Sequence, residues 1–87
     1  MNWEGFTKTR HDLKRPLLVV SGSKGVLACS YLSVTTFTKL EEAGATVSGV
    51  GDFDAMLQAK IVEASPAAVG LGVRVGMTGR EALERFR

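Results

Sequence analysis

A single cysteine is the only soft nucleophile in this chain. Cys29 follows the apolar residues Val26, Leu27 and Ala28 near the end of an expected strand. Apolar surroundings raise the pKa of a thiol and make it inert, whereas a catalytic thiol needs a base or a helix N-terminus to form thiolate. The residue types therefore favour a buried packing role. A reactive or ligand-contacting thiol is the alternative, because a helix expected to begin at Ser33 could supply that N-terminus.

Two glycine-containing segments resemble loops that bind anions. In Ser21–Gly25, glycine amides and Lys24 could surround a phosphate. This segment leads into a strand rather than a helix, so a hairpin turn is the favoured interpretation. Gly49–Asp52 lies between an expected strand and an expected helix, which is a better place for a ligand, although it lacks the third glycine of a dinucleotide-binding fingerprint.

One candidate ligand site is expected at the ends of neighbouring strands, where the residues that follow Cys29 would meet the Gly49–Asp52 segment. Cys29 is its candidate catalytic residue, and the candidate ligand-binding residues are Tyr31, Ser33, Gly49, Gly51 and Asp52. An enzymatic role stays undecided, because no base is placed beside the thiol in sequence.

The polar N-terminal stretch shows no catalytic pair. His11 and Asp12 are adjacent in an alternating segment, so their side chains point to opposite faces of a strand. Lys8, Arg10 and Lys14 could bind RNA phosphates, but they equally suit an edge strand protected against aggregation. No aromatic residues are interleaved for base stacking, so we do not expect nucleic-acid binding.

Length and composition restrict what can stabilise the fold. An 87-residue chain forms one domain and buries only about 60–65% of its unfolded surface, so its stability margin is thin. One cysteine and one histidine provide neither an intrachain disulfide nor a zinc cluster, so we expect no metal and no cofactor. A second subunit is then the expected source of stability. The cysteine usage and the lack of a signal or membrane segment predict a cytoplasmic protein.

The charges are unevenly distributed along the chain. Residues 1–25 carry five Lys/Arg against two acidic residues, residues 26–63 carry two against five, and residues 64–87 carry four against two. The net charge of +2 is therefore a small imbalance among few groups, which supports ordinary solubility rather than a polyanionic partner.

The apolar pattern predicts an α+β fold led by an N-terminal β-hairpin. Alternation over residues 5–13 predicts a strand, and a hairpin follows with strands over 16–20 and 26–31. Gly22 and Gly25 are expected to supply positive φ values in its loop.

Three to four short helices are expected to pack on this mixed sheet. Ser33 is the expected N-cap of a helix that ends at Gly44, with an apolar face of Val34, Phe37, Leu40 and Ala43. A strand over 46–50 should then run parallel to a hairpin strand.

Three further N-caps are visible: Asp52, Ser65 and Thr78. Pro66 supports the second by occupying the first helical position, and Glu81 completes a capping box in the third. Between the first two caps, residues 60–63 alternate as a short strand does.

Two aromatic residues lie at the N-terminus, where chains fray unless they dock against something. Trp3 and Phe6 are costly to leave in water, so we expect them to dock, on their own subunit or on a neighbour.

A distinctive order of segments runs through residues 14–84: Pro16–Val20, Lys24–Cys29, Tyr31–Leu32, Gly49–Val50, Phe53–Leu57, Ala59–Val62 and Leu71–Leu83. This order resembles the YunC-like family of small uncharacterised bacterial and archaeal proteins. The resemblance implies an α+β domain whose N-terminal β region, here residues 1–15, mediates homo-oligomerisation, with a tetramer as the implied assembly. It implies no reaction. The family pattern has glycine and asparagine at Ser30 and Ser33, so a ligand site there would be altered in this chain.

We therefore expect residues 1–87 to form a single α+β domain. The first functional hypothesis is a cytoplasmic homo-oligomeric binding or assembly module with Trp3 and Phe6 in its interface. The alternative is a small-ligand-binding protein or enzyme with its site near Cys29, Ser33 and Asp52.

Overall fold

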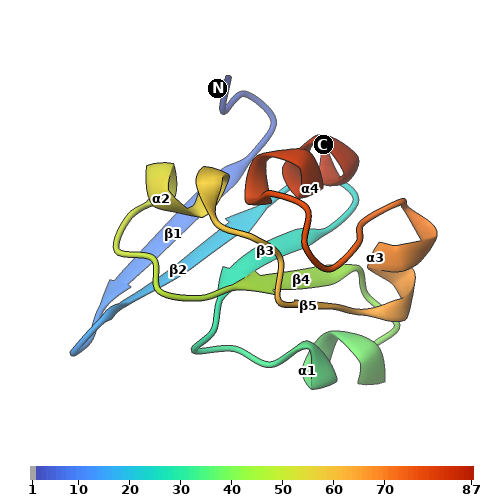
Figure 1. Ribbon diagram of the computed structural model, residues 1–87, viewed down its shortest axis with the longest axis horizontal. Helices are drawn as coiled ribbons and strands as arrows, with labels where there is room; N and C mark the ends of the chain where they lie inside the picture. The colour runs from blue at the N-terminus through green and yellow to red at the C-terminus, as the bar shows by residue number, and fades with distance from the viewer. Residues whose placement is uncertain (1) are drawn as a thin grey trace.

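Figure 1 shows a computed structural model of the chain, which describes residues 2–87 apart from the side chain of Thr36. The strands are β1 (Thr7–Asp12), β2 (Pro16–Ser21), β3 (Val26–Cys29), β4 (Gly44–Val47) and β5 (Glu63–Ala64). The helices are α1 (Val34–Lys39), α2 (Phe53–Gln58), α3 (Pro66–Gly70) and α4 (Gly79–Phe86). The predicted α+β class is confirmed.

All five strands form one mixed sheet in the order β1-β2-β3-β4-β5. The pairs β1–β2, β2–β3 and β4–β5 are antiparallel, whereas β3 and β4 are parallel and are connected through α1. This arrangement confirms both the N-terminal hairpin and the crossover that was expected to bring β4 parallel to a hairpin strand.

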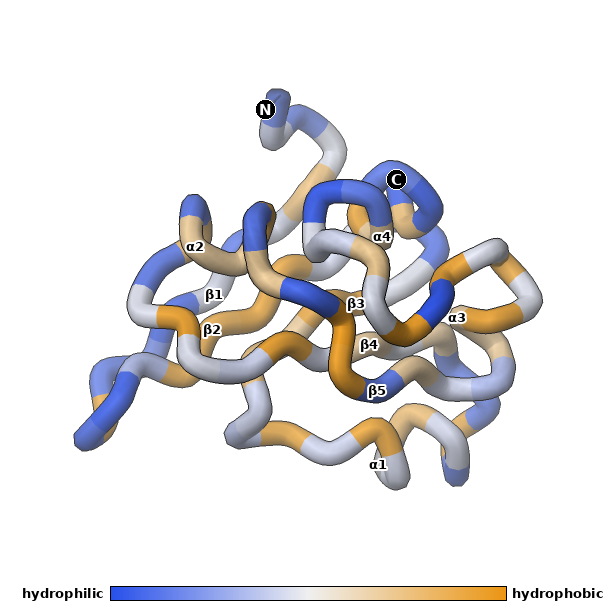
Figure 2. The backbone as a smooth tube through the Cα atoms, viewed as in Figure 1, coloured by the Kyte–Doolittle hydropathy of each residue, from blue (hydrophilic) through white to orange (hydrophobic). Residues whose placement is uncertain are grey.

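Helices cover both faces of the sheet (Figure 1). On one face, Leu27 of β3 lies beneath Gly79 at the start of α4. On the other face, Phe37 of α1 packs directly on Gly44 of β4. Figure 2 shows hydrophobic residues along β2, β3 and β4, whereas β1 is mostly hydrophilic. The core therefore lies over the inner strands, and β1 stands outside it.

The first helix is shorter than predicted. It ends at Lys39 rather than near Gly44, and Leu40 is 62% exposed instead of lying on the buried face. The chain turns at Glu41, whose φ is +58°, and the N–H of Glu42 donates to the Phe37 carbonyl. Because the chain turns this early, β4 begins at Gly44, two residues before its predicted start.

Two other strand predictions need correction. The strand β3 ends at Cys29 rather than at residue 31, because Leu32 N–H turns back to the Cys29 carbonyl. The strand expected over 60–63 is a single bridge between Lys60 and Thr78, followed by β5.

The predicted reason for glycine in the hairpin loop is wrong. Among the glycines, φ is positive at Gly5, Gly49, Gly72 and Gly76, and not at Gly22 or Gly25. A Cβ at Gly22 would collide with the Phe86 carbonyl, and one at Gly25 would collide with the Phe86 ring. Both glycines are therefore required by close packing against α4.

The three later N-caps are confirmed. Asp52 Oδ1 accepts from Ala55 N–H at 2.7 Å, and Ser65 Oγ accepts from Ala68 N–H at 3.4 Å. Thr78 forms the capping box with Glu81 at the start of α4. In the part of the chain that the structure describes, no helix has the length and apolar character that crossing a bilayer requires.

The capping box predicts a pH dependence of stability. The hydrogen bond that the carboxylate accepts from Thr78 N–H lowers the pKa of Glu81, and the Thr78 hydroxyl adds to this effect. Because the folded-state pKa is the lower one, the stabilisation is complete above the unfolded pKa of about 4.3 and is lost as pH falls through the folded pKa.

Replacing Glu81 by Gln keeps a capping side chain that does not titrate. Between about pH 5 and pH 3, we expect the free energy of unfolding to fall less in Glu81→Gln than in the unchanged protein, as measured by urea unfolding. Equal losses in both proteins would contradict this role of the carboxylate.

Candidate functional site

The predicted ligand-site segments lie together at the carboxyl ends of the parallel strands β3 and β4. Because β3 and β4 are parallel and Cys29 is opposite Val47, the segments that follow them leave the sheet together. These segments contain Tyr31 and Ser33 after β3, and Gly49–Asp52 after β4.

The thiol of Cys29 faces β2 rather than those segments. Cys29 is 4% exposed, and its Sγ accepts from Leu18 N–H at 3.4 Å and donates to the Pro16 carbonyl at 3.8 Å. The β2–β3 pairing ends at Val19 and Ala28, so the sulfur continues the hydrogen bonding where the strands separate. This geometry gives the Cys29 side chain a packing role.

Three other candidate side chains already accept hydrogen bonds from backbone N–H groups of this chain. The Tyr31 hydroxyl accepts from Arg15 N–H at 3.2 Å, and Ser33 Oγ accepts from Thr35 N–H at 3.1 Å. Asp52 caps α2. Gly49 and Gly51 have no atom within 4 Å of a Cβ position, so they lie on an open surface. Within residues 2–87, no three His, Cys, Asp or Glu side chains gather as metal ligands.

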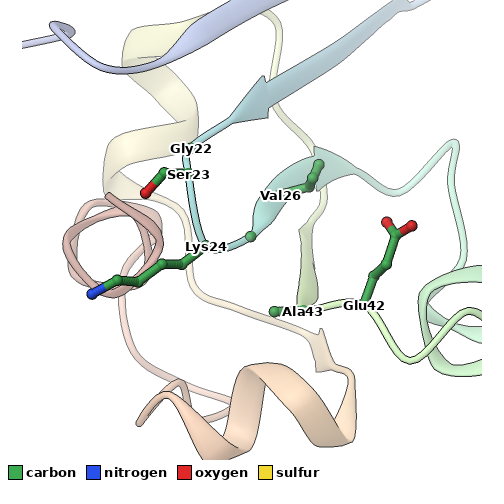
Figure 3. Close-up of a pocket in the computed structure, with 7 residues that line it drawn as sticks. Gly22, Ser23, Lys24, Val26, Glu42 and Ala43 are labelled. Carbon is green, nitrogen blue, oxygen red and sulfur yellow. The ribbon is translucent and has the colours of Figure 1, made fainter.

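A hollow of about 250 Å³ lies at the opposite end of the parallel pair (Figure 3). The lining residues are Gly22, Ser23, Lys24, Gly25, Val26, Glu42 and Ala43. Figure 3 shows the Lys24 side chain extending over α4 and the Glu42 side chain extending away from it, so the two charges do not converge. Gly22 N–H donates to the Gly25 carbonyl and Lys24 N–H to the Phe86 carbonyl, which supports the turn interpretation of this loop.

The N-terminal aromatic residues pack on their own chain. The Trp3 ring meets the rings of Phe6 and Phe53 edge to face, each with centroids 6.3 Å apart. Arg87 lies 4.8 Å from the Phe6 centroid and donates to the carbonyls of Asn2 and Glu4. The N-terminal segment is therefore fastened to α2 and to the end of α4 at the start of β1.

The outer strand is a free sheet edge. All six residues of β1 are exposed, and among residues 2–87 it pairs only with β2. The other edge strand, β5, has two residues, and the chain just before it bonds to residues 76–79. The sequence pattern left this position open, since the basic residues of this stretch suit a protected edge strand and a phosphate-binding face equally.

The hydrogen-bond pattern shows which β1 groups face outward. Gly22 N–H donates to Gly25 and Leu18 N–H donates to Cys29 Sγ, so even-numbered residues of β2 direct their backbone groups toward β3. Neighbouring residues alternate in this direction, so the β1–β2 bonds belong to the odd-numbered pairs, such as Thr9 with Val19. The outward backbone groups of β1 are those of Lys8, Arg10 and Asp12.

Comparison with known proteins gives a consistent family. The domain of unknown function DUF1805 matches residues 28–86. The uncharacterised protein YunC of Bacillus subtilis (strain 168) is 36% identical over 87 residues, covering 92% of this chain and 86% of YunC. A crystal structure of a Thermoplasma acidophilum protein of unknown function superposes with a TM-score of 0.90 at 36% identity, covering 94% of this chain and 81% of that one.

The domain match runs from Ala28, in the second half of β3, to the end of α4, and the similarities to YunC and to the Thermoplasma acidophilum protein extend over nearly the whole chain. This protein therefore belongs to the YunC-like family, whose shared domain has no assigned function.

Proposed function

We propose that this protein is a cytoplasmic homo-oligomeric assembly module whose subunits join through the outer edge of β1. The observation that carries this proposal is the free six-residue edge. Unpaired backbone donors and acceptors on an edge strand are a template for another strand. Because β1 buries none of its side chains, pairing with a second chain would stabilise a strand that its own core supports little.

Two further features support self-assembly, and a third supports the cytoplasmic location. A domain of 87 residues has a thin stability margin, which a partner subunit increases. Trp3 and Phe6 remain only partly buried beside the start of β1, so they extend the proposed interface. The single buried cysteine suits the reducing cytoplasm, where disulfides do not stabilise small domains.

A proline at an outward-facing position tests the proposal. Arg10→Pro removes one outward N–H without removing a bond to β2, and proline is tolerated at such edge positions. Native mass spectrometry should show a multiple of the chain mass for the unchanged protein and for Arg10→Ala, but a monomer for Arg10→Pro. Both variants lose the Arg10–Asp12 ion pair, so that contact is controlled. A monomeric unchanged protein would overturn the proposal.

A small-ligand function is the second candidate. The parallel strands β3 and β4 end side by side, which favours this function, since ligands of open α/β sheets bind outside the carboxyl ends of parallel strands. Tyr31, Ser33, Gly49, Gly51 and Asp52 would line that site, with Cys29 behind it. The same native spectra test it: a reproducible small adduct on the unchanged protein supports a ligand, and bare protein masses oppose it.

A further inference from the structure

We propose that two copies pair their β1 strands antiparallel about a two-fold axis that passes beside Arg10, an inference that rests on the proposed function. Closed two-fold dimers are the commonest assemblies of identical chains, and each contact in them occurs twice. The register follows from three constraints: the pleat of the strand, the direction of its backbone groups and its charges.

The pleat excludes most ways of joining the two edges. A two-fold axis parallel to the strands would make the two β1 strands parallel but would turn one sheet over. Each residue would then lie beside its own copy, with the two side chains on opposite faces of the joined sheet. An axis perpendicular to the sheet makes the strands antiparallel and preserves both faces. Residues directly opposite each other must then share a face, so even-numbered residues lie opposite even-numbered ones.

The backbone groups of β1 that face away from β2 select one register among those that remain. The residues whose N–H and C=O face outward are Lys8, Arg10 and Asp12. With the axis at Arg10, all three lie opposite members of the same set, so each subunit uses every outward group of β1. An axis at Thr9 leaves Asp12 opposite Phe6, and an axis at His11 leaves Lys8 opposite Lys14; both lie outside β1.

The charges favour this register over the one with its axis at Thr9. With the axis at Arg10, Lys8 lies opposite Asp12 of the partner subunit, and this pair occurs twice. With the axis at Thr9, Lys8 instead lies opposite Arg10 of the partner subunit, also twice, and like charges directly opposite are destabilising. Arg10 faces its own copy across the axis, and its guanidinium bonds to Asp12 at 2.9 Å in its own strand, so the Asp12 carboxylate lies beside Arg10 of its own strand and Lys8 of the partner subunit.

This register joins the two five-stranded sheets into one continuous sheet. Because the axis preserves the faces, α2 and α4 of both copies lie on the same side of it. Lys8 Nζ lies 4.7 Å from the Trp3 ring centroid, so the N-terminal aromatic residues would adjoin the ends of the paired strands.

Disulfide cross-linking of the full chain tests the register. Cysteines at Arg10 would have Cα atoms about 5.5 Å apart, which lies within the range that a disulfide spans. In the same register, two copies of Thr9→Cys would be about 8 Å apart across the axis, too far for a disulfide. Cys29 is 4% exposed and does not compete.

Under mild oxidation with oxidised glutathione, Arg10→Cys should give a covalent dimer that dithiothreitol cleaves. Thr9→Cys and His11→Cys should each stay uncross-linked alone and should form a heterodimer when mixed. Glu63→Cys, on the opposite edge of the sheet, controls for random collision.

The outcomes separate the register from the assembly. If the unchanged protein is oligomeric but Thr9→Cys or His11→Cys cross-links alone in preference to Arg10→Cys, the register is wrong and self-assembly stands. If it is oligomeric and none of the β1 variants cross-links above the Glu63→Cys level, β1 pairing is overturned. A monomeric unchanged protein overturns both.

Discussion

Gly79→Ala should abolish the folded state or destabilise it by about 4 kcal/mol or more. Gly79 is a buried residue at the start of α4, and its N–H donates to the Ala59 carbonyl at 2.8 Å. A Cβ there would collide with the backbone carbonyl of Met56 and would lie 3.2 Å from Leu27 Cδ2. Because the obstacle is the backbone of α2, no side-chain rotation relieves it, and α4 must move away from the core.

Urea unfolding followed by far-UV circular dichroism measures this effect. The matched control is Gly70→Ala, at the end of α3, where a Cβ meets nothing within 4 Å and φ is not positive. Because alanine favours the helical conformation over glycine, this control should keep or slightly raise the stability, by up to about 1 kcal/mol. Equal unfolding midpoints for the two variants would refute the close approach of α4 to α2.

Ser65→Ala is expected to cost about 3 kcal/mol. Ser65 is fully buried, and its hydroxyl accepts from Gly44 N–H at 2.9 Å and donates to the Glu42 carbonyl at 2.8 Å. It also caps α3, so one hydroxyl joins the start of β4 to the start of that helix. Alanine would leave the buried Gly44 N–H without its partner, and such a group costs more to leave unpaired than its bond contributes.

Ser33→Ala is the control for Ser65→Ala, because Ser33 also accepts a hydrogen bond at a helix start but is exposed. Losing an exposed cap costs about 1 kcal/mol, so chemical unfolding should separate the two variants clearly. A Ser65→Ala variant no less stable than Ser33→Ala would show that water replaces the lost partner.

The N-caps were predictable because each is a local interaction. Asp52 and Thr78 bond to backbone groups within three residues, so their residue types and spacing contain the whole interaction. The hairpin glycines were located correctly but explained wrongly. Gly22 and Gly25 are fixed by Phe86, which is about sixty residues away in sequence, and no local pattern shows that contact.

The candidate sites show the same limit. The sequence identified residue types that suit a ligand, and the parallel strands β3 and β4 bring the segments that contain them to the same end of the sheet. It did not show that the Tyr31 hydroxyl binds the Arg15 backbone, since that contact depends on how the β1–β2 turn folds back. Which β1 groups face outward depends on the bond from Leu18 to Cys29 Sγ, and a strand's own residues do not reveal the direction of its backbone groups.

The contacts of Phe86 and Arg87 have a consequence for the order of folding. Phe86 fills the space above the hairpin loop, and Arg87 holds the carbonyls of Asn2 and Glu4. The hairpin leaves the ribosome well before Phe86 does, yet the contacts that fix its loop come from that residue. Closing so long a loop costs entropy that only the finished core repays. Nascent chains of this protein should therefore expose the apolar residues of β2 and β3 until Phe86 has left the ribosome.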